Sequence, residues 1–195
     1  MKRLFLILLI CVTTMSVFSQ NTRDNTALIL IDIQDFYFPG GDVALEAPEA
    51  ASVNAAEVLE LFRKKGLTVV HVRHEYDPGG DIHTNVAPNP GEKVISKSEV
   101  NAFLNTDLLE YLNQNKIENI VLCGMQTHMC LEAATRAAHD FGFECTVIAD
   151  ACATRDLAFG DQNVKAKDVH ASTLKTLNSY AEVVTTEGFM AGNKK

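Results

Sequence analysis

The sequence has 195 residues, of which 47% are hydrophobic, and its 25 acidic residues outnumber its 17 lysines and arginines. That length supports one domain with a substantial core. A mean hydropathy of +0.02, with 11 glycines and 5 prolines, excludes a disordered or collagen-like chain. An isoelectric point near 5.2 argues against electrostatic binding of nucleic acid. Five cysteines are too few for a disulfide scaffold of this length.

The first 19 residues differ in character from the rest of the chain. A Lys-Arg pair precedes nine apolar residues at 4–12, and small residues follow up to Ser19. This order is typical of a secretory signal peptide, and the apolar run is short for a membrane span. A buried first strand or an uncleaved anchor is the alternative. We predict a signal peptide at 1–19 and a single domain at 20–195, exported to the periplasm or secreted, with no stable membrane anchoring after cleavage.

Cleavage after Ser19 would change both the charge and the cysteine count. It would leave 176 residues with 15 basic and 25 acidic side chains, a net charge of −10. Cys11 would be lost, and the four remaining cysteines would be Cys123, Cys130, Cys145 and Cys152. An even number in an exported protein allows two disulfides. Cys123 and Cys145, however, fall in predicted central strands, where cysteine is usually a small buried hydrophobe. We therefore expect no structural disulfide.

Strands and helices are predicted to alternate along the chain. Continuous apolar runs indicate buried strands, and apolar residues repeating at i, i+3, i+4 and i+7 indicate helices. The expected strands are 27–32, 67–74, 93–97, 117–123, 144–149 and 182–186, and the expected helices are 49–65, 107–115, one carrying Cys130 and ending at Gly142, and 163–180. Residues 75–92 contain three prolines and three glycines and predict a loop beside a site. Repeated βα units imply one α/β domain with a parallel sheet.

Three residues of different chemistry follow the ends of predicted strands. Asp32 ends the first strand, Lys97 ends the strand at 93–97, and Cys130 follows the strand at 117–123. Ligands of such sheets bind beyond the carboxyl ends of the strands, so these side chains are candidates for one site. A helix N-terminus and Lys97 would both favour a Cys130 thiolate, and Asp32 could transfer its proton. Each residue also has a structural interpretation, as a helix cap, a solvated lysine or a packed cysteine.

The segments around these residues resemble the isochorismatase-like cysteine hydrolases, which include nicotinamidases and related amidases. The resemblance covers about residues 25–190 and includes several separated motifs in the family's order. The matching segments are 27–36 for the first strand with its aspartate at Asp32, 94–97 for the lysine segment, 123–131 for the nucleophile loop with its cysteine at Cys130, and 150–154 for the element after the next strand.

This resemblance implies a three-layer αβα fold and a catalytic triad of Asp32, Lys97 and Cys130. It also implies a cis peptide bond between Met125 and Gln126, and an oxyanion hole formed by the amides of Gln126 and Cys130. The implied reaction is attack of Cys130 on a small-molecule amide, loss of ammonia or an amine, and hydrolysis of the thioester, with no organic cofactor. Oligomers are frequent among the relatives, so we expect a homo-oligomer.

The departures from the family bear on the reaction and on metal binding. Isochorismatases that cleave a vinyl ether generally lack the cysteine, so Cys130 favours amide hydrolysis. A vinyl-ether hydrolase and a non-catalytic binding protein of the same fold remain the alternatives. Nicotinamidases commonly bind a metal just after the second strand. In that region this chain has His74, Asp81 and His83, without the expected third histidine arrangement, so we expect no metal.

Other residues near the motifs are expected to contact the substrate or to support the fold. Phe36 ends the first motif and is expected to form a pocket wall, although an aromatic residue there is as often core. His128 lies two residues before Cys130 and is expected to border the pocket. His170, on the predicted helix at 163–180, is expected to be structural. The residues that select the substrate are expected in the loop at 75–92. A partner subunit is the second place where such residues are expected.

Overall fold

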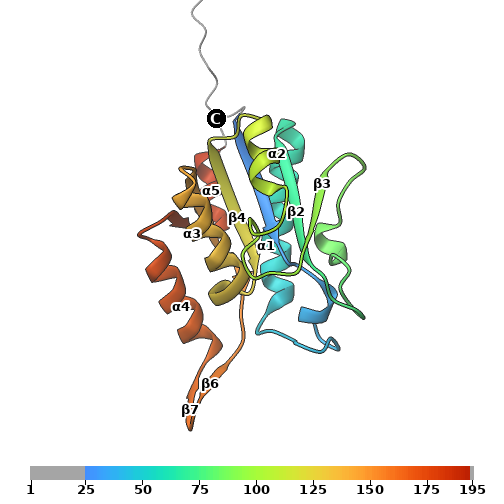
Figure 1. The fold of residues 1–195 in the computed structure, drawn as a ribbon. Coiled ribbons are helices and arrows are strands. Elements are labelled where there is room, and N and C mark those ends of the chain that lie inside the picture. The colour runs from blue at the N-terminus through green and yellow to red at the C-terminus, as the bar shows by residue number, and fades with distance from the viewer. Residues whose placement is uncertain (1–24, 194–195) are drawn as a thin grey trace, which may run out of the picture.

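The computed structural model describes residues 25–193 of the chain. Within them, six parallel strands form one sheet in the order β3-β2-β1-β4-β5-β8 (Figure 1). The strands of this sheet are β1 (Thr26–Ile31), β2 (Thr68–His74), β3 (Lys93–Lys97), β4 (Asn119–Met125), β5 (Glu144–Ala153) and β8 (Glu182–Val184). The predicted parallel α/β sheet is therefore confirmed. The predicted signal peptide at 1–19 lies outside the described residues and stays a prediction.

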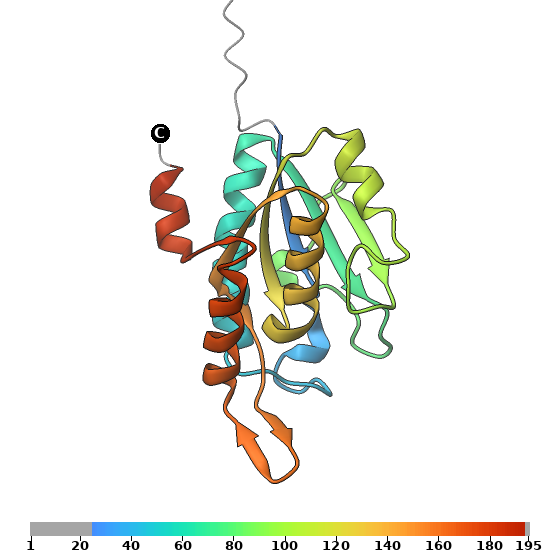
Figure 2. The same ribbon diagram turned by 60° about the vertical axis from the view of Figure 1, so that its left-hand side comes forward.

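Helices cover both faces of the sheet and complete the three layers. Helices α1 and α5 lie on one face, and α2, α3 and α4 lie on the other (Figures 1 and 2). The helices are α1 (Pro48–Lys65), α2 (Leu108–Gln114), α3 (Glu132–Asp140), α4 (Ala166–Leu177) and α5 (Thr186–Gly192), and a small hairpin is formed by β6 (Leu157–Phe159) and β7 (Gln162–Val164). No helix within residues 25–193 combines the length and the apolar character needed to span a membrane.

The order of the strands marks where a ligand would bind. From β1 the chain passes through α1 to β2 on one side, and from β3 it passes through α2 to β4 on the other side of β1. The direction of winding therefore changes between β1 and β4, which are neighbours. In open α/β sheets, ligands bind at such a change of direction, beyond the carboxyl ends of the strands. Asp32 follows β1 at this point, and the segment leading to Cys130 follows β4.

The core sits on both faces of the central strands. Each residue of β1 from Ala27 to Ile31 is at most 2% exposed, as expected for a strand covered by helices on both sides. Helix α1 buries Val58, Leu59 and Phe62 against the sheet. Burying one such side chain contributes about 1.5–3 kcal/mol. Gly66 ends the helix with a left-handed φ of +64°, as its sequence position predicts.

The predicted helix at 163–180 is wrong at its beginning. The β6–β7 hairpin occupies the residues before it, turning at Gly160, whose φ is +60°. Helix α4 starts only at Ala166, because the Asp156 carboxylate accepts the Ala166 N–H at 2.8 Å and fixes the start of the helix there. The hairpin projects from the body of the molecule (Figure 2), and Phe159 on it is 88% exposed.

The C-terminal part contains one helix that the sequence analysis missed. The last strand was predicted to run to Thr186, but β8 ends at Val184 and α5 begins at Thr186. The Thr185 hydroxyl accepts the Gly188 N–H at 3.2 Å and so caps the N-terminus of α5. The sequence signal for this cap is a threonine three residues before a glycine. The Asp150 carboxylate also accepts the Thr186 N–H at 2.7 Å and so attaches α5 to the sheet.

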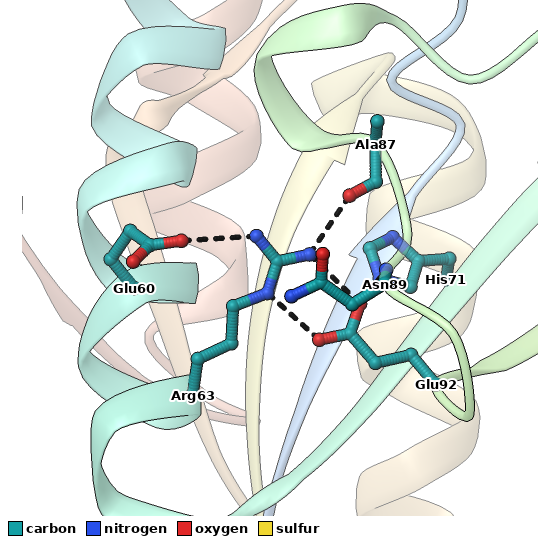
Figure 3. A network of polar contacts seen from close by, with 6 residues as sticks. All are labelled: Glu60, Arg63, His71, Ala87, Asn89 and Glu92. Carbon is teal, nitrogen blue, oxygen red and sulfur yellow. Dashed lines mark hydrogen bonds and ion pairs between the residues drawn. The ribbon is translucent and has the colours of Figure 1, made fainter.

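A polar cluster holds the loop at 75–92 against α1 and β2 (Figure 3). Arg63 donates from Nε and Nη2 to the two oxygens of Glu92, at 2.8 Å each, and Nη2 also donates to the Ala87 carbonyl at 2.8 Å. The buried His71 ring lies 2.9 Å from Glu92, and the Asn89 N–H donates to the same carboxylate. Bidentate pairs of this kind are among the stronger protein hydrogen bonds. The hydrogen bonds from Arg63, outweighing the effect of burial, hold the pKa of Glu92 at about 2.

The Glu92→Gln variant should lower the free energy of unfolding by about 1–3 kcal/mol near neutral pH, because it removes the charged acceptor of this cluster. Since the folded pKa of Glu92 lies below its ordinary value of 4.5, the contribution is complete above pH 4.5 and is lost as the pH falls toward 2. Urea unfolding from pH 7 down to pH 3 measures this. The difference in free energy of unfolding between the wild type and Glu92→Gln should shrink below pH 4.5. A difference that does not change with pH would contradict the stabilising role of the Glu92 charge. Glu60→Gln, which changes a more exposed partner of Arg63, is the control and should cost well under 1 kcal/mol.

Candidate active site

Strand register brings the predicted site residues to one end of the sheet. Lys97 ends β3 and pairs in register with His74, which ends β2. Asp32 follows β1, and its N–H donates to the Val72 carbonyl at 2.9 Å. The backbone of Asp32 has a left-handed φ of +48°, a conformation that non-glycine residues adopt rarely and that is concentrated at functional sites.

The nucleophile segment needs a glycine to approach β1 closely. A Cβ atom at Gly124 would lie 2.0 Å from the Ile31 carbonyl oxygen, and Gly124 has a φ of +133°. No other residue fits there. The chain then forms a wide π-helical turn at Thr127–Leu131, and α3 begins only after it. Cys130 lies within this turn, which is the first turn of the helical segment that begins at Thr127 and continues as α3.

The three predicted catalytic residues meet in one buried cluster. Lys97 Nζ lies 2.7 Å from Asp32 Oδ2 and 3.4 Å from Cys130 Sγ. Asp32 is fully buried, Lys97 is 2% exposed and Cys130 is 5% exposed. In the described part of the chain, neither carboxylate oxygen of Asp32 accepts a hydrogen bond, and Oδ2 is held only by the ion pair, so the carboxylate is able to accept a proton. The arrangement places an acid, a thiol and an ammonium where proton transfer between them is possible.

Burial opposes ionisation of the Cys130 thiol. Burial and the negative charge of Asp32 raise the pKa of Cys130 to about 12, and the opposing effect of Lys97 is smaller. The predicted support of the thiolate by a helix N-terminus and Lys97 stays a prediction, and the burial of Cys130 opposes it. Burial also raises the pKa of Asp32 despite Lys97. A carboxylate of raised pKa is a better proton acceptor, so the thiol can lose its proton to Asp32 during attack.

The backbone before the nucleophile has the form that the family resemblance implied. The peptide bond between Met125 and Gln126 is cis. The carbonyl of Gln126 accepts the N–H groups of Met129 and Leu131, at 3.0 and 3.3 Å, and shapes the turn that carries the cysteine. The side chain of Gln126 is buried and contacts the Tyr37 hydroxyl at 3.5 Å. The oxyanion role of the Gln126 and Cys130 amides stays a prediction.

Two histidines attach the nucleophile turn to its surroundings. His128 Nδ1 lies 2.6 Å from the Thr154 hydroxyl, just beyond the end of β5, and burial lowers the pKa of His128. His170 Nδ1, on α4, lies 2.9 Å from the Thr127 hydroxyl. The contact of His170 agrees with its predicted structural role. His128 is half-buried, and its predicted contact with substrate stays a prediction.

Phe36 belongs to an aromatic cluster at the edge of the site. Its ring centroid lies 4.2 Å from that of Tyr37 and 4.4 Å from that of Tyr76, and the side chain is 4% exposed. Phe36 also borders a surface hollow together with Pro39 and Pro78. It is thus a core residue with one side near the surface, and its predicted place in the wall of a substrate pocket stays a prediction.

The candidate metal ligands are engaged separately. His74 Nδ1 lies 3.2 Å from Lys97 Nζ, whereas His83 stacks on Phe38 with ring centroids 3.6 Å apart and accepts the Asn85 N–H. Among residues 25–193, no three His, Cys, Asp or Glu side chains come together in a way that could hold a metal ion.

The three other cysteines that the structure describes are buried and lie outside this cluster. Cys123, Cys145 and Cys152 are buried, and none is bonded to another cysteine of the described chain. Burial raises the pKa of each, to about 12 for Cys145 and Cys152. They therefore pack as small apolar side chains, as the strand positions of two of them predict.

Comparisons with known proteins define the class. Residues 26–188 match the isochorismatase domain. An uncharacterized isochorismatase family protein of Bacillus subtilis, YddQ, is 43% identical over 85% of this chain and 98% of its own. The maleamate amidohydrolase of Pseudomonas putida is 30% identical over 84% of each chain. A crystal structure of an isochorismatase-type hydrolase from Oleispira antarctica superposes with a TM-score of 0.83 and 43% identity, over 86% of this chain and 97% of its own.

The fold and site therefore define a hydrolase-type α/β domain with a cysteine beside the point, between β1 and β4, where the direction of winding changes. The chain belongs to the isochorismatase family.

The Asp32→Asn variant tests the proton acceptor. If Asp32 takes the thiol proton during attack, the variant should slow alkylation of Cys130 by iodoacetamide at pH 7 about 10²-fold. If Asp32 acted only through its negative charge, which raises the pKa of Cys130, the variant should instead speed alkylation. Mass spectrometry of the peptide carrying Cys130 measures the rate, and peptides carrying the other cysteines serve as internal references. Asp35→Asn, which changes an exposed carboxylate three residues away, is the control. Equal rates in Asp32→Asn and the wild type would exclude Asp32 as the base.

Proposed function

We propose that the protein is a cysteine-dependent hydrolase that cleaves a non-peptide C–N bond of a small-molecule amide through a thioester. The observation that carries the proposal is the buried contact of Lys97 with both Asp32 and Cys130, at 2.7 and 3.4 Å. A lysine, an aspartate and a cysteine in mutual contact are a nucleophile, its base and a counter-ion. A non-catalytic binding protein would gain nothing from three buried polar groups, because burying them is costly.

The first half of the reaction uses all three residues. Asp32 removes the proton from the Cys130 thiol as the sulfur attacks the amide carbonyl carbon. The N–H groups of Gln126 and Cys130 stabilise the resulting oxyanion. Asp32 then gives the proton to the departing nitrogen, the C–N bond breaks, and a thioester remains on Cys130. Lys97 keeps its positive charge throughout and offsets the negative charge that moves between carboxylate and sulfur.

The second half releases the acid and restores the site. Asp32, again a carboxylate, removes a proton from a water molecule, which attacks the thioester carbonyl. The C–S bond breaks, the carboxylic acid leaves, and the thiol regains the proton. This scheme needs no organic cofactor, because nucleophile, base and counter-ion all come from the chain.

The comparison with maleamate amidohydrolase supports amide cleavage over the alternatives, since the name of that relative describes hydrolysis of an amide. A vinyl-ether hydrolase is the second candidate, and the family name favours it. That reaction adds water to a carbon–carbon double bond and requires an acid but no sulfur nucleophile, so the buried thiol beside Asp32 would have no use. The two candidates therefore make opposite predictions for a variant without the thiol.

The Cys130→Ala variant should lose at least about 10³-fold in the rate of ammonia release, because the attacking atom is removed. A screen of small primary amides, each assayed for ammonia, identifies a substrate for the wild type. Rapid acid quenching followed by mass spectrometry should then show the acyl group on the peptide carrying Cys130. Cys130→Ser, which keeps the size and polarity of the side chain, controls for packing. Full activity in Cys130→Ala would contradict the thioester mechanism and favour the vinyl-ether reaction.

A further inference from the structure

Lys97 has a third polar neighbour that the triad does not include. His74 Nδ1 lies 3.2 Å from Lys97 Nζ, on the next strand and in register with it. An ammonium has three N–H donors and no acceptor, and a buried N–H requires a partner. Three atoms lie near the ammonium: Cys130 Sγ and His74 Nδ1 at hydrogen-bond distance, and Asp32 Oδ2 as its ion-pair partner.

We propose that His74 is a positioning residue for the nucleophile, because its Nδ1 accepts the third N–H of Lys97 and holds the ammonium between Asp32 and Cys130. This inference rests on the proposed function. Since the ammonium can only donate, the Nδ1 atom that faces it carries no proton, and the ring proton is on Nε2. His74 therefore acts through Lys97 and does not itself attack or protonate the substrate.

The backbone of His74 is held by a side chain that has no other evident use. Gln34 is fully buried, and its Oε1 accepts the His74 N–H at 2.7 Å. Its Nε2 donates to the His74 carbonyl at 2.9 Å and to the Gly80 carbonyl at 2.7 Å. The side chain of Gln34 thus pairs with the end of β2 as a strand would, and its hydrogen bonds fix both the position of His74 and the start of the loop at 75–92.

The contact has a chemical consequence at the sulfur. The contact with His74 Nδ1 fixes where the Lys97 ammonium lies relative to Cys130 Sγ. Lys97 is 2% exposed, so protein atoms rather than water must hold its ammonium in place. The positive charge of Lys97 opposes the burial that raises the pKa of Cys130. Removing the acceptor at position 74 should therefore make loss of the thiol proton harder, without touching the substrate.

Three substitutions separate this role from simple packing. His74→Leu removes the acceptor and keeps an apolar side chain of similar size. His74→Asn keeps an acceptor oxygen at the same distance along the side chain as Nδ1. His74→Gln carries its amide one carbon further out, where it cannot replace Nδ1. His83→Asn is the matched control, because His83 is also a half-buried histidine near this edge but contacts Phe38 rather than Lys97.

The experiment measures alkylation of Cys130 by iodoacetamide at pH 7 in the full-length folded variants, with thermal unfolding of each. His74→Leu and His74→Gln should react about tenfold more slowly than the wild type, whereas His74→Asn and His83→Asn should stay within about threefold of it. If His74→Leu fails to fold, the alkylation rates of His74→Asn and His74→Gln still test the proposal. On an amide substrate, the slow variants should lose kcat with KM little changed.

Two results would overturn the proposal: equal alkylation of His74→Leu and the wild type, or equal alkylation of His74→Asn and His74→Gln. Because alkylation needs no substrate, these results are distinct from failure of the proposed function. That function fails if the wild type releases product from no amide or if Cys130→Ala keeps full activity.

Discussion

The ion pair between Asp32 and Lys97 is the interaction on which the site depends. Both side chains are buried, so their pairing offsets a large cost of removing charge from water. A pair of apolar side chains would hold the same place with equal or greater stability. In the mechanism that we propose, the pair is retained for what it does to Cys130, whose thiol it deprotonates and whose negative charge it balances. The burial of the apolar strands and helices around the pair offsets the free-energy cost of burying its charges.

The topology explains why such a pair can exist at this place. Strands β1 and β3 deliver Asp32 and Lys97 to the same edge from two sides of β2, and the turn after β4 brings Cys130 onto them. Rigid parallel strands fix these distances better than loops could. His74 and Gln34 then satisfy donors and backbone groups that the arrangement would leave without partners.

Most of the fold could be predicted from the sequence because buried parallel strands are continuous apolar runs and the helices carry clear periodicity. Asp32, Lys97 and Cys130 could be selected because strand ends converge, and the family resemblance reinforced the selection. The β6–β7 hairpin was missed because its short strands are exposed and carry no apolar pattern. The contact of His74 with Lys97 was missed because it depends on register between strands, and the raised pKa of Cys130 was missed because it depends on burial. Export and a homo-oligomer stay predictions.

The measurement that tests this account most directly is a double-mutant cycle with Asp32→Asn and Lys97→Met, in which both unfolding and alkylation of Cys130 are followed. Each single variant should lose about 3–5 kcal/mol of stability, because it leaves its partner buried without compensation. The double variant should recover most of that loss and yet alkylate Cys130 no faster than Asp32→Asn. Additive losses of stability, or wild-type alkylation in the double variant, would contradict the claim that the pair is retained for the chemistry of Cys130.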